Sequence, residues 1–158
     1  MKIRKVIAVI TTFVLLLALF TACGSKKTDY DEAVRLYQDG LYDKALAKFQ
    51  TLGDYEASAD YKIKCIENQL VGNWGSLLGE SGYWYLDVFS ANNRIDLYTG
   101  SQKDVKLNTS GTWTVTEKEI TIVTDKGGTQ TWPITIEEGV IKYYELRDTG
   151  IQFVKLDD

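Results

Sequence analysis

The spacing of apolar residues changes near residue 70, and no other feature of the sequence constrains the fold as strongly. Before this point, apolar residues recur every three or four positions, as on one face of a helix. After it, apolar and polar residues alternate, as in strands with one buried face. Helical and strand patterns are thus segregated along the chain, which predicts an α+β fold.

Three helices are predicted before the change. Thr28 is expected to cap the first helix and Gly40 to end it, while Gly53 ends the second. The third is expected over Tyr55–Leu70, where Cys65 would flank the packed face or be partly exposed. The apolar faces are Tyr30, Ala33, Val34 and Tyr37 in the first helix, Tyr42, Ala45, Leu46, Phe49 and Leu52 in the second, and Tyr55, Ala59, Ile63, Ile66 and Leu70 in the third.

Eight strand-like segments follow, separated by turns rich in Gly, Asn and Asp. They are Leu70–Leu77, Tyr83–Ser90, Arg94–Thr99, Val105–Thr116, Glu119–Thr124, Thr129–Ile136, Val140–Leu146 and Ile151–Leu156. Such short connections suit strands that each form a hairpin with the one before, and closure removes exposed edges. The sequence therefore predicts an eight-stranded, mainly antiparallel up-and-down β-barrel over residues 70–158.

Alternation indicates which side chains face the interior of this barrel. The inward set is Ile95, Leu97, Trp113, Val115, Ile120, Ile122, Trp132, Ile134 and Ile136. The second strand is ambiguous, because Trp84, Leu86 and Val88 form one apolar face and Tyr83, Tyr85, Asp87 and Phe89 form the other. Asp87 is expected to face outward; facing inward, it would bind a polar group of a ligand. Pro133 cannot donate to a ladder and predicts a bulge or seam.

The N-terminus has the pattern of a targeting segment. Three basic residues in Met1–Lys5 precede Val6–Phe20, an apolar run of signal-peptide length. The run ends in Leu19-Phe20-Thr21-Ala22-Cys23, which resembles the lipobox of bacterial lipoproteins. The resemblance implies cleavage after residue 22 and acylation of Cys23 with diacylglycerol and palmitate. It also implies a short tether over residues 23–28 and an anchor on the extracytoplasmic face of a bacterial membrane in the cell envelope. Without residues 1–22 the chain has 15 basic and 22 acidic residues, a net charge of −7.

The helical segment, residues 29–69, resembles a single tetratricopeptide repeat. The residues that carry the resemblance are Ala33, Leu36, Gly40, Tyr42, Ala45, Leu46 and Phe49. Arrays of such repeats bind peptides, but about three repeats are needed for a stable groove. The resemblance thus implies a helical hairpin that serves as a spacer or scaffold or as a contact surface for a protein partner.

The strand segment resembles the small lipocalin-like domains of bacterial lipoproteins. The resemblance rests on Gly72-Asn73-Trp74, on Gly111-Thr112-Trp113, and on Phe89 followed by Asn92-Asn93 and Ile95. It implies that Gly72 and Trp74 form a structural plug at the closed end of the barrel. It also implies that a late basic residue, Arg147 or Lys155, packs on Trp74. We expect Gly72 to allow a close approach of a neighbouring element.

Composition excludes several functional classes. The chain contains no His, so neither a Ser-His-Asp triad nor a His-ligated zinc site can form within it. The net charge of −4 argues against nucleic-acid binding. No constellation of acids suggests an enzyme, a metal site or a cofactor.

Two functional hypotheses remain. The first is a membrane-anchored, non-enzymatic lipoprotein that acts as a protein-interaction or scaffolding module. The second is an extracytoplasmic barrel that binds a small apolar or amphipathic ligand. The candidate contact residues are Trp84, Tyr85, Asp87 and Tyr143. An apolar cavity would favour the second hypothesis, and a filled barrel with an exposed aromatic patch would favour the first.

Overall fold

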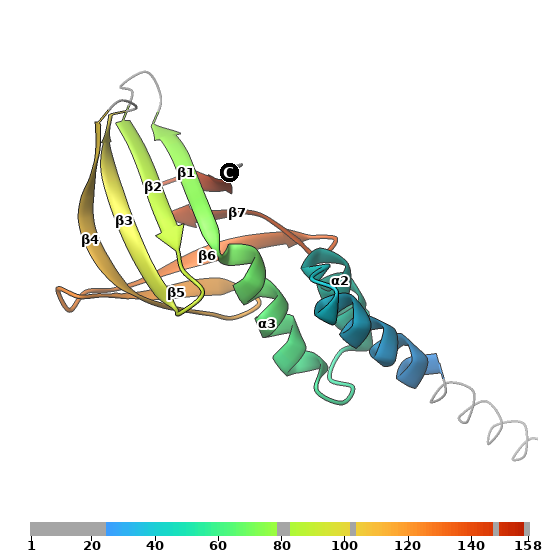
Figure 1. Ribbon diagram of the computed structural model, residues 1–158. Coiled ribbons are helices and arrows are strands. Elements are labelled where there is room, and N and C mark those ends of the chain that lie inside the picture. The colour runs from blue at the N-terminus through green and yellow to red at the C-terminus, as the bar shows by residue number, and fades with distance from the viewer. Residues whose placement is uncertain (1–24, 79–82, 102–103, 147–148, 157–158) are drawn as a thin grey trace, which may run out of the picture.

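The computed structural model describes residues 25–78, 83–101, 104–146 and 149–156. Its helices are residues 25–38, α2 (Tyr42–Leu52) and α3 (Ser58–Leu70). Its strands are β1 (Gly72–Leu78), β2 (Tyr83–Phe89), β3 (Arg94–Ser101), β4 (Asp104–Val115), β5 (Glu119–Thr124), β6 (Thr129–Glu137), β7 (Val140–Leu146) and β8 (Ile151–Lys155). The helices gather at one end of the barrel that the strands form (Figure 1). The predicted signal segment and Cys23 lie outside the described residues.

The eight strands form a closed barrel in sequence order, and every neighbouring pair is antiparallel. Pairing of β1 with β8 closes it, through Trp74 with Lys155 and Gly75 with Val154. The prediction of an α+β chain with an eight-stranded up-and-down barrel is confirmed. Because α3 ends at Leu70 and β1 begins at Gly72, the change of hydropathy period coincides with the change of secondary structure.

Two predicted helix starts are wrong. The first helix is already formed at residue 25, so Thr28 lies inside it and does not cap it. The third helix begins at Ser58, because Glu56 has a φ of 49° and interrupts helical geometry after Tyr55. The carbonyl of Tyr55 instead accepts hydrogen bonds from the backbone N–H and the hydroxyl of Ser58.

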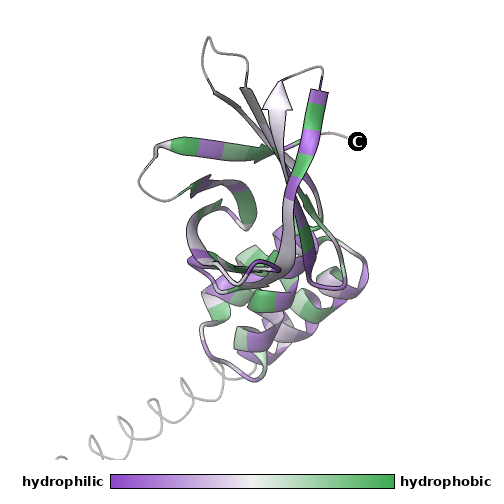
Figure 2. Cartoon of the chain, turned by 90° about the vertical axis from the view of Figure 1, so that its left-hand side faces the viewer, coloured by the Kyte–Doolittle hydropathy of each residue, from purple (hydrophilic) through white to green (hydrophobic). Residues whose placement is uncertain are grey.

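The inward face predicted from alternation is largely confirmed, and polar and apolar stretches alternate along the strands (Figure 2). Those buried are Ile95, Leu97, Trp113, Val115, Ile120, Ile122 and Trp132, whereas Ile134 and Ile136 are half-buried. The latter two follow Pro133, where β6 changes partner. Residues 129–133 pair with β5 and residues 134–137 pair with β7, with a register shift between Thr135 and Ile136. The expected seam at Pro133 is therefore present.

The helices are joined to the barrel by specific contacts. The side-chain amide of Gln69 donates to the carbonyl of Gly139, and its oxygen accepts from the backbone N–H of Ile141. Lys62 forms an ion pair with Glu117 at 2.7 Å, between α3 and the β4–β5 turn. A Cβ on Gly139 would lie 2.0 Å from the carbonyl oxygen of Asp43, so α2 and the β6–β7 turn meet backbone to backbone. These contacts fix the helices against one end of the barrel.

Candidate functional site

The barrel end nearest the helices is filled by side chains. Trp74 is fully buried, and its indole N–H donates to the carbonyl of Leu70 at 2.7 Å. The ammonium of Lys155 lies 5.9 Å from the centre of the Trp74 ring and donates to the carbonyls of Gln69 and Val71. Of the two basic residues predicted to pack on Trp74, Lys155 therefore does so, whereas Arg147 lies outside the described residues.

The reason expected for Gly72 is not the one the structure gives. A Cβ there would meet only the flexible side chain of Lys155, at 3.4 Å, which is an ordinary contact. The backbone of Gly72 has a φ of 125°, a conformation that residues with a side chain rarely adopt. Glycine is therefore required by the turn from α3 into β1, and not by a close approach.

Tyr144, on β7, is the centre of the aromatic core above this end. It is fully buried and contacts the rings of Trp74, Phe89, Trp132 and Phe153 at centroid distances of 4.8 to 5.8 Å. The rings of Trp132 and Phe153 are nearly parallel to it. Two members of this cluster, Trp132 and Phe153, also line a cavity inside the barrel.

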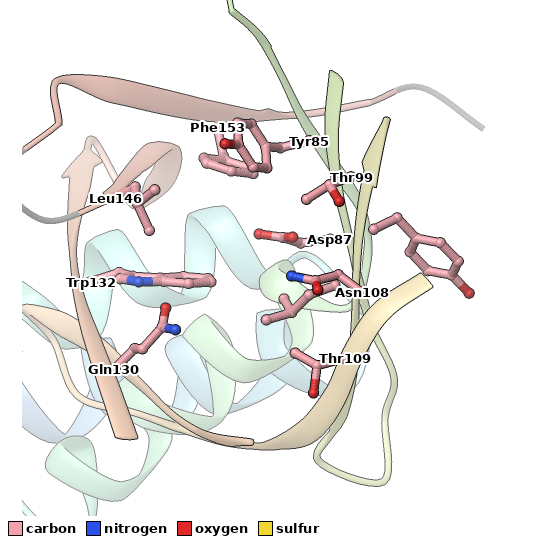
Figure 3. A pocket seen from close by; sticks show the side chains of 11 residues that line it. Tyr85, Asp87, Thr99, Asn108, Thr109, Gln130, Trp132, Leu146 and Phe153 are labelled. Carbon is pink, nitrogen blue, oxygen red and sulfur yellow. The ribbon is translucent and has the colours of Figure 1, made fainter. Parts of the chain in front are cut away.

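A hollow of about 180 Å³ lies inside the barrel, against the rings of Trp132 and Phe153 from this cluster. The lining is mostly apolar and aromatic, with a few hydroxyl and amide groups (Figure 3). The residues that line it are Tyr85, Asp87, Leu97, Tyr98, Thr99, Asn108, Thr109, Gln130, Trp132, Leu146 and Phe153. An apolar cavity with a few convergent polar groups is the usual form of a small-molecule site.

Asp87 points into this cavity, so the expectation that it faces outward is wrong. Its side chain is only 3% exposed, and Oδ2 accepts a hydrogen bond of 2.5 Å from the hydroxyl of Tyr144. The other oxygen, Oδ1, has no hydrogen-bond partner among the described residues. The ambiguity of β2 is resolved accordingly, with Tyr85, Asp87 and Phe89 on the inner face.

Burial changes the acidity of both members of this pair. Loss of solvation raises the pKa of Asp87 to about 7, although the hydrogen bond from Tyr144 opposes the rise. Burial also raises the pKa of Tyr144 well above its usual value, and the carboxylate of Asp87 adds to that rise. Tyr144 is therefore the hydrogen donor, and Asp87 is the group that titrates near neutral pH.

A second hollow, of about 360 Å³, lies beside Thr129–Trp132 and Leu146. It shares Gln130, Trp132 and Leu146 with the interior cavity. In this region β6 forms no ladder with β7, because residues 129–133 pair only with β5. The two hollows therefore adjoin at the part of β6 that precedes Pro133 and forms no ladder with β7.

The other candidates lie elsewhere. Of the four predicted contact residues, Tyr85 and Asp87 line the cavity. Tyr143 is half-buried and does not line it, because it precedes the inward Tyr144 on β7 and so points to the other side of the strand. The side chain of Trp84 lies outside what the structure describes. Cys65 is fully buried, and burial raises the pKa of its thiol to about 12, so it is an unreactive core residue.

Most of the cavity lining was not identified from the sequence. Thr99, Asn108, Thr109, Gln130, Leu146 and Phe153 come from five different strands. Trp132 and Leu97 were assigned to the interior, but alternation does not distinguish a side chain that fills a barrel from one that borders a cavity.

Comparisons with protein-family models, with curated proteins and with solved structures gave no significant match. Within the described part of the chain, no cluster of acidic, Cys or His side chains is arranged to hold a metal ion. In the same part, every helix is too short or too polar to cross a membrane.

Proposed function

We propose that this protein is a membrane-anchored binding protein of the cell envelope whose barrel captures a small apolar or amphipathic molecule. The observation that carries the proposal is the aromatic cavity with a buried carboxyl at its floor. A purely structural barrel of this size would be filled by its own side chains.

The volume limits the ligand. An apolar cavity of about 150 Å³ is large enough for benzene, whereas drug-sized ligands occupy about 300–1,000 Å³. The interior hollow of about 180 Å³ therefore suits one ring, a short chain, or the end of a longer molecule.

The helices and the tether would place this barrel near a membrane. The lipobox-like sequence before Cys23 supports lipid attachment, and the tetratricopeptide-like hairpin supports a rigid spacer between the anchor and the barrel. The closed eight-stranded barrel with a buried Trp74 near its start is consistent with a lipocalin-like domain. Cys23→Ser should abolish incorporation of a labelled fatty acid and release the protein from membranes. Equal labelling of the variant would contradict the anchor.

The scaffolding hypothesis has less support. It calls for an exposed aromatic patch, but the exposed large apolar residues of the described chain are Leu41, Leu107, Val123 and Val154. None is aromatic, and single exposed aliphatic residues are normal on a protein surface.

Native mass spectrometry of the chain purified from its host membranes tests ligand capture. We expect a small molecule to accompany the protein, and Leu97→Trp, which fills the cavity, to remove it. Val123→Trp, on an exposed position of β5, is the matched control and should retain it. The same bound mass in both variants, or a protein partner alone, would contradict the proposal.

A further inference from the structure

We propose that the captured molecule is a small organic amine, bound as its ammonium ion by Asp87 and surrounded by the aromatic rings of the cavity. This inference rests on the proposed function and adds the chemical class of the ligand. It is carried by the position of the carboxyl, by the side chains around it and by the absence of any basic group in the lining described.

One oxygen of the Asp87 carboxyl accepts no hydrogen bond from the described residues. Asp87 projects from β2 between the ring of Trp132 on one side and the rings of Tyr85 and Phe153 on the other (Figure 3). Tyr144 occupies Oδ2, which leaves Oδ1 available to a hydrogen-bond donor. Of the described residues that line the cavity, Asp87 alone is charged.

The fold does not need an acid at this position. The hydroxyl of Tyr144 requires only an acceptor, which the amide oxygen of Asn would supply without a charge. A buried carboxylate without a counter-charge is costly, and such groups are normally paired. No Lys or Arg of the described lining neutralises Asp87, so the missing cation is a natural role for the ligand.

The walls of the cavity also favour a cation. Aromatic faces carry negative potential and attract ammonium groups within about 6 Å of the ring centre. Tyr85, Trp132 and Phe153 supply such faces, and the side-chain oxygens of Asn108 and Gln130 offer further acceptors. The acidic chain, at a net charge of −4, attracts cations from solution.

Other ligand classes fit less well. An anion such as a fatty-acid carboxylate would meet Asp87 with no basic residue of the described lining to hold it. A purely apolar ligand would leave Oδ1 buried and unpaired, which costs free energy. A molecule with a protonated amine on an aromatic ring or short alkyl chain satisfies both the carboxyl and the apolar walls.

The pH behaviour follows from the same group. The pKa of Asp87 is about 7 in the empty barrel, and a bound ammonium would lower it by stabilising the ionised form. Among the described residues, the other titratable groups that face the carboxyl are the hydroxyls of Tyr144 and Tyr85. Amine binding should therefore weaken as the pH falls below 7.

Calorimetry with two matched probes tests the assignment. The full chain in phosphatidylcholine nanodiscs is titrated at pH 8 with 2-phenylethylamine and with 2-phenylethanol, which replaces the ammonium by a hydroxyl. We expect the amine to bind at least about tenfold more tightly, because hydrogen bonds to charged groups are stronger than neutral ones. Asp87→Asn should remove this preference. Asp96→Asn, the same change on the outer face of β3, should keep it.

The outcomes separate the ligand class from ligand capture itself. Equal affinity for the two probes in the unaltered chain, or a preference that survives Asp87→Asn, overturns the amine assignment. Ligand capture stands in those cases if Leu97→Trp abolishes binding of both probes. No binding of the amine at all also overturns the assignment, and native mass spectrometry then decides on ligand capture separately.

Discussion

The two parts of the barrel interior use similar residues for opposite purposes. Near the helices, Trp74 is fully buried, its N–H is hydrogen-bonded to Leu70, and Lys155 covers its ring. Farther from the helices, Trp132 is also buried, at 4% exposure, but one side of it borders a hollow. Both are inward Trp residues on strands of one barrel, so burial alone does not distinguish a plug from the wall of a cavity.

The two parts differ in how many of their polar groups find hydrogen-bond partners on the surrounding elements. At the filled end, α3 supplies a carbonyl for each donor, since Lys155 and Trp74 both bond to residues 69–71. In the hollow part, the described side chains leave a space of about 180 Å³ beside the strand that changes partner after Pro133. None of the described residues forms a hydrogen bond to Oδ1 of Asp87 there. We therefore expect the filled end to supply stability, whereas the hollow part is where we propose that a ligand binds.

The largest expected effect compares the two Trp residues. Trp74→Ala should cost about 3–5 kcal/mol of unfolding free energy, because it leaves a cavity in a closely packed region and an unpaired carbonyl at Leu70. Trp132→Ala should cost clearly less, since part of its surface contacts no other atoms. Urea titration followed by circular dichroism measures both. Equal costs would show that the hollow part is as tightly packed as the plug.

The next effect tests the docking of the helices. Gly139→Ala combines a φ of 81° with a Cβ only 2.0 Å from the Asp43 carbonyl oxygen, so we expect a loss of about 2–4 kcal/mol. Gly127→Ala is the control, because Gly127 has a similar φ of 87° but nothing near its Cβ position. It should lose only about 1 kcal/mol, the cost of placing a side chain in the left-handed backbone region. A similar loss for both would mean that the helices yield easily at this contact.

A smaller effect depends on pH. The pKa of Asp87 is about 7 in the folded chain against an ordinary value of 3.8, so between these values the folded state holds more protons than the unfolded state. The contribution of Asp87 to the free energy of unfolding should therefore be most favourable below pH 4. It should decrease as the pH rises from there through 7. Asp87→Asn should be more stable than the unaltered chain by about 1–3 kcal/mol at pH 8, with a smaller gap at pH 5.

Thermal unfolding of the ligand-free chain at pH 5 and pH 8 measures this gap. Asp96→Asn, at a half-buried outer position of β3, is the control and should show no comparable change between the two values. A gap that does not depend on pH would mean that Asp87 is not the group that titrates.

The smallest effect concerns Lys155, which lies over the ring of Trp74. Lys155→Met should cost about 1 kcal/mol, because it loses two hydrogen bonds to Gln69 and Val71 but keeps an apolar stem against Trp74. Equilibrium denaturation at low salt, compared with Lys142→Met on an exposed position of β7, checks it. No difference between the two variants would show that Trp74 alone closes this end.

Alternation predicted the strands and most of their inner faces, because one buried face is enough to impose a period of two. It left β2 ambiguous, because both of its faces are apolar, and the separate expectation that Asp87 faces outward was wrong. Thr28 and Tyr55 show a similar limit at helix ends, where local backbone geometry decides within a few residues. Gly72 and Trp74 were identified by resemblance, although the reason for the glycine was different.

The sequence by itself determined the order of helices and strands and the change at Leu70, because hydropathy period and turn residues act locally. Closure of the eight strands was inferred from the cost of exposed strand edges. The sequence also singled out Pro133 as a seam, since a missing N–H is a property of the residue alone. Only the tertiary structure decided that Asp87 meets Tyr144, 57 positions away, within a cavity walled by several strands. Desolvation and cavity volume depend on every neighbour at once, and those neighbours come together only when the barrel closes.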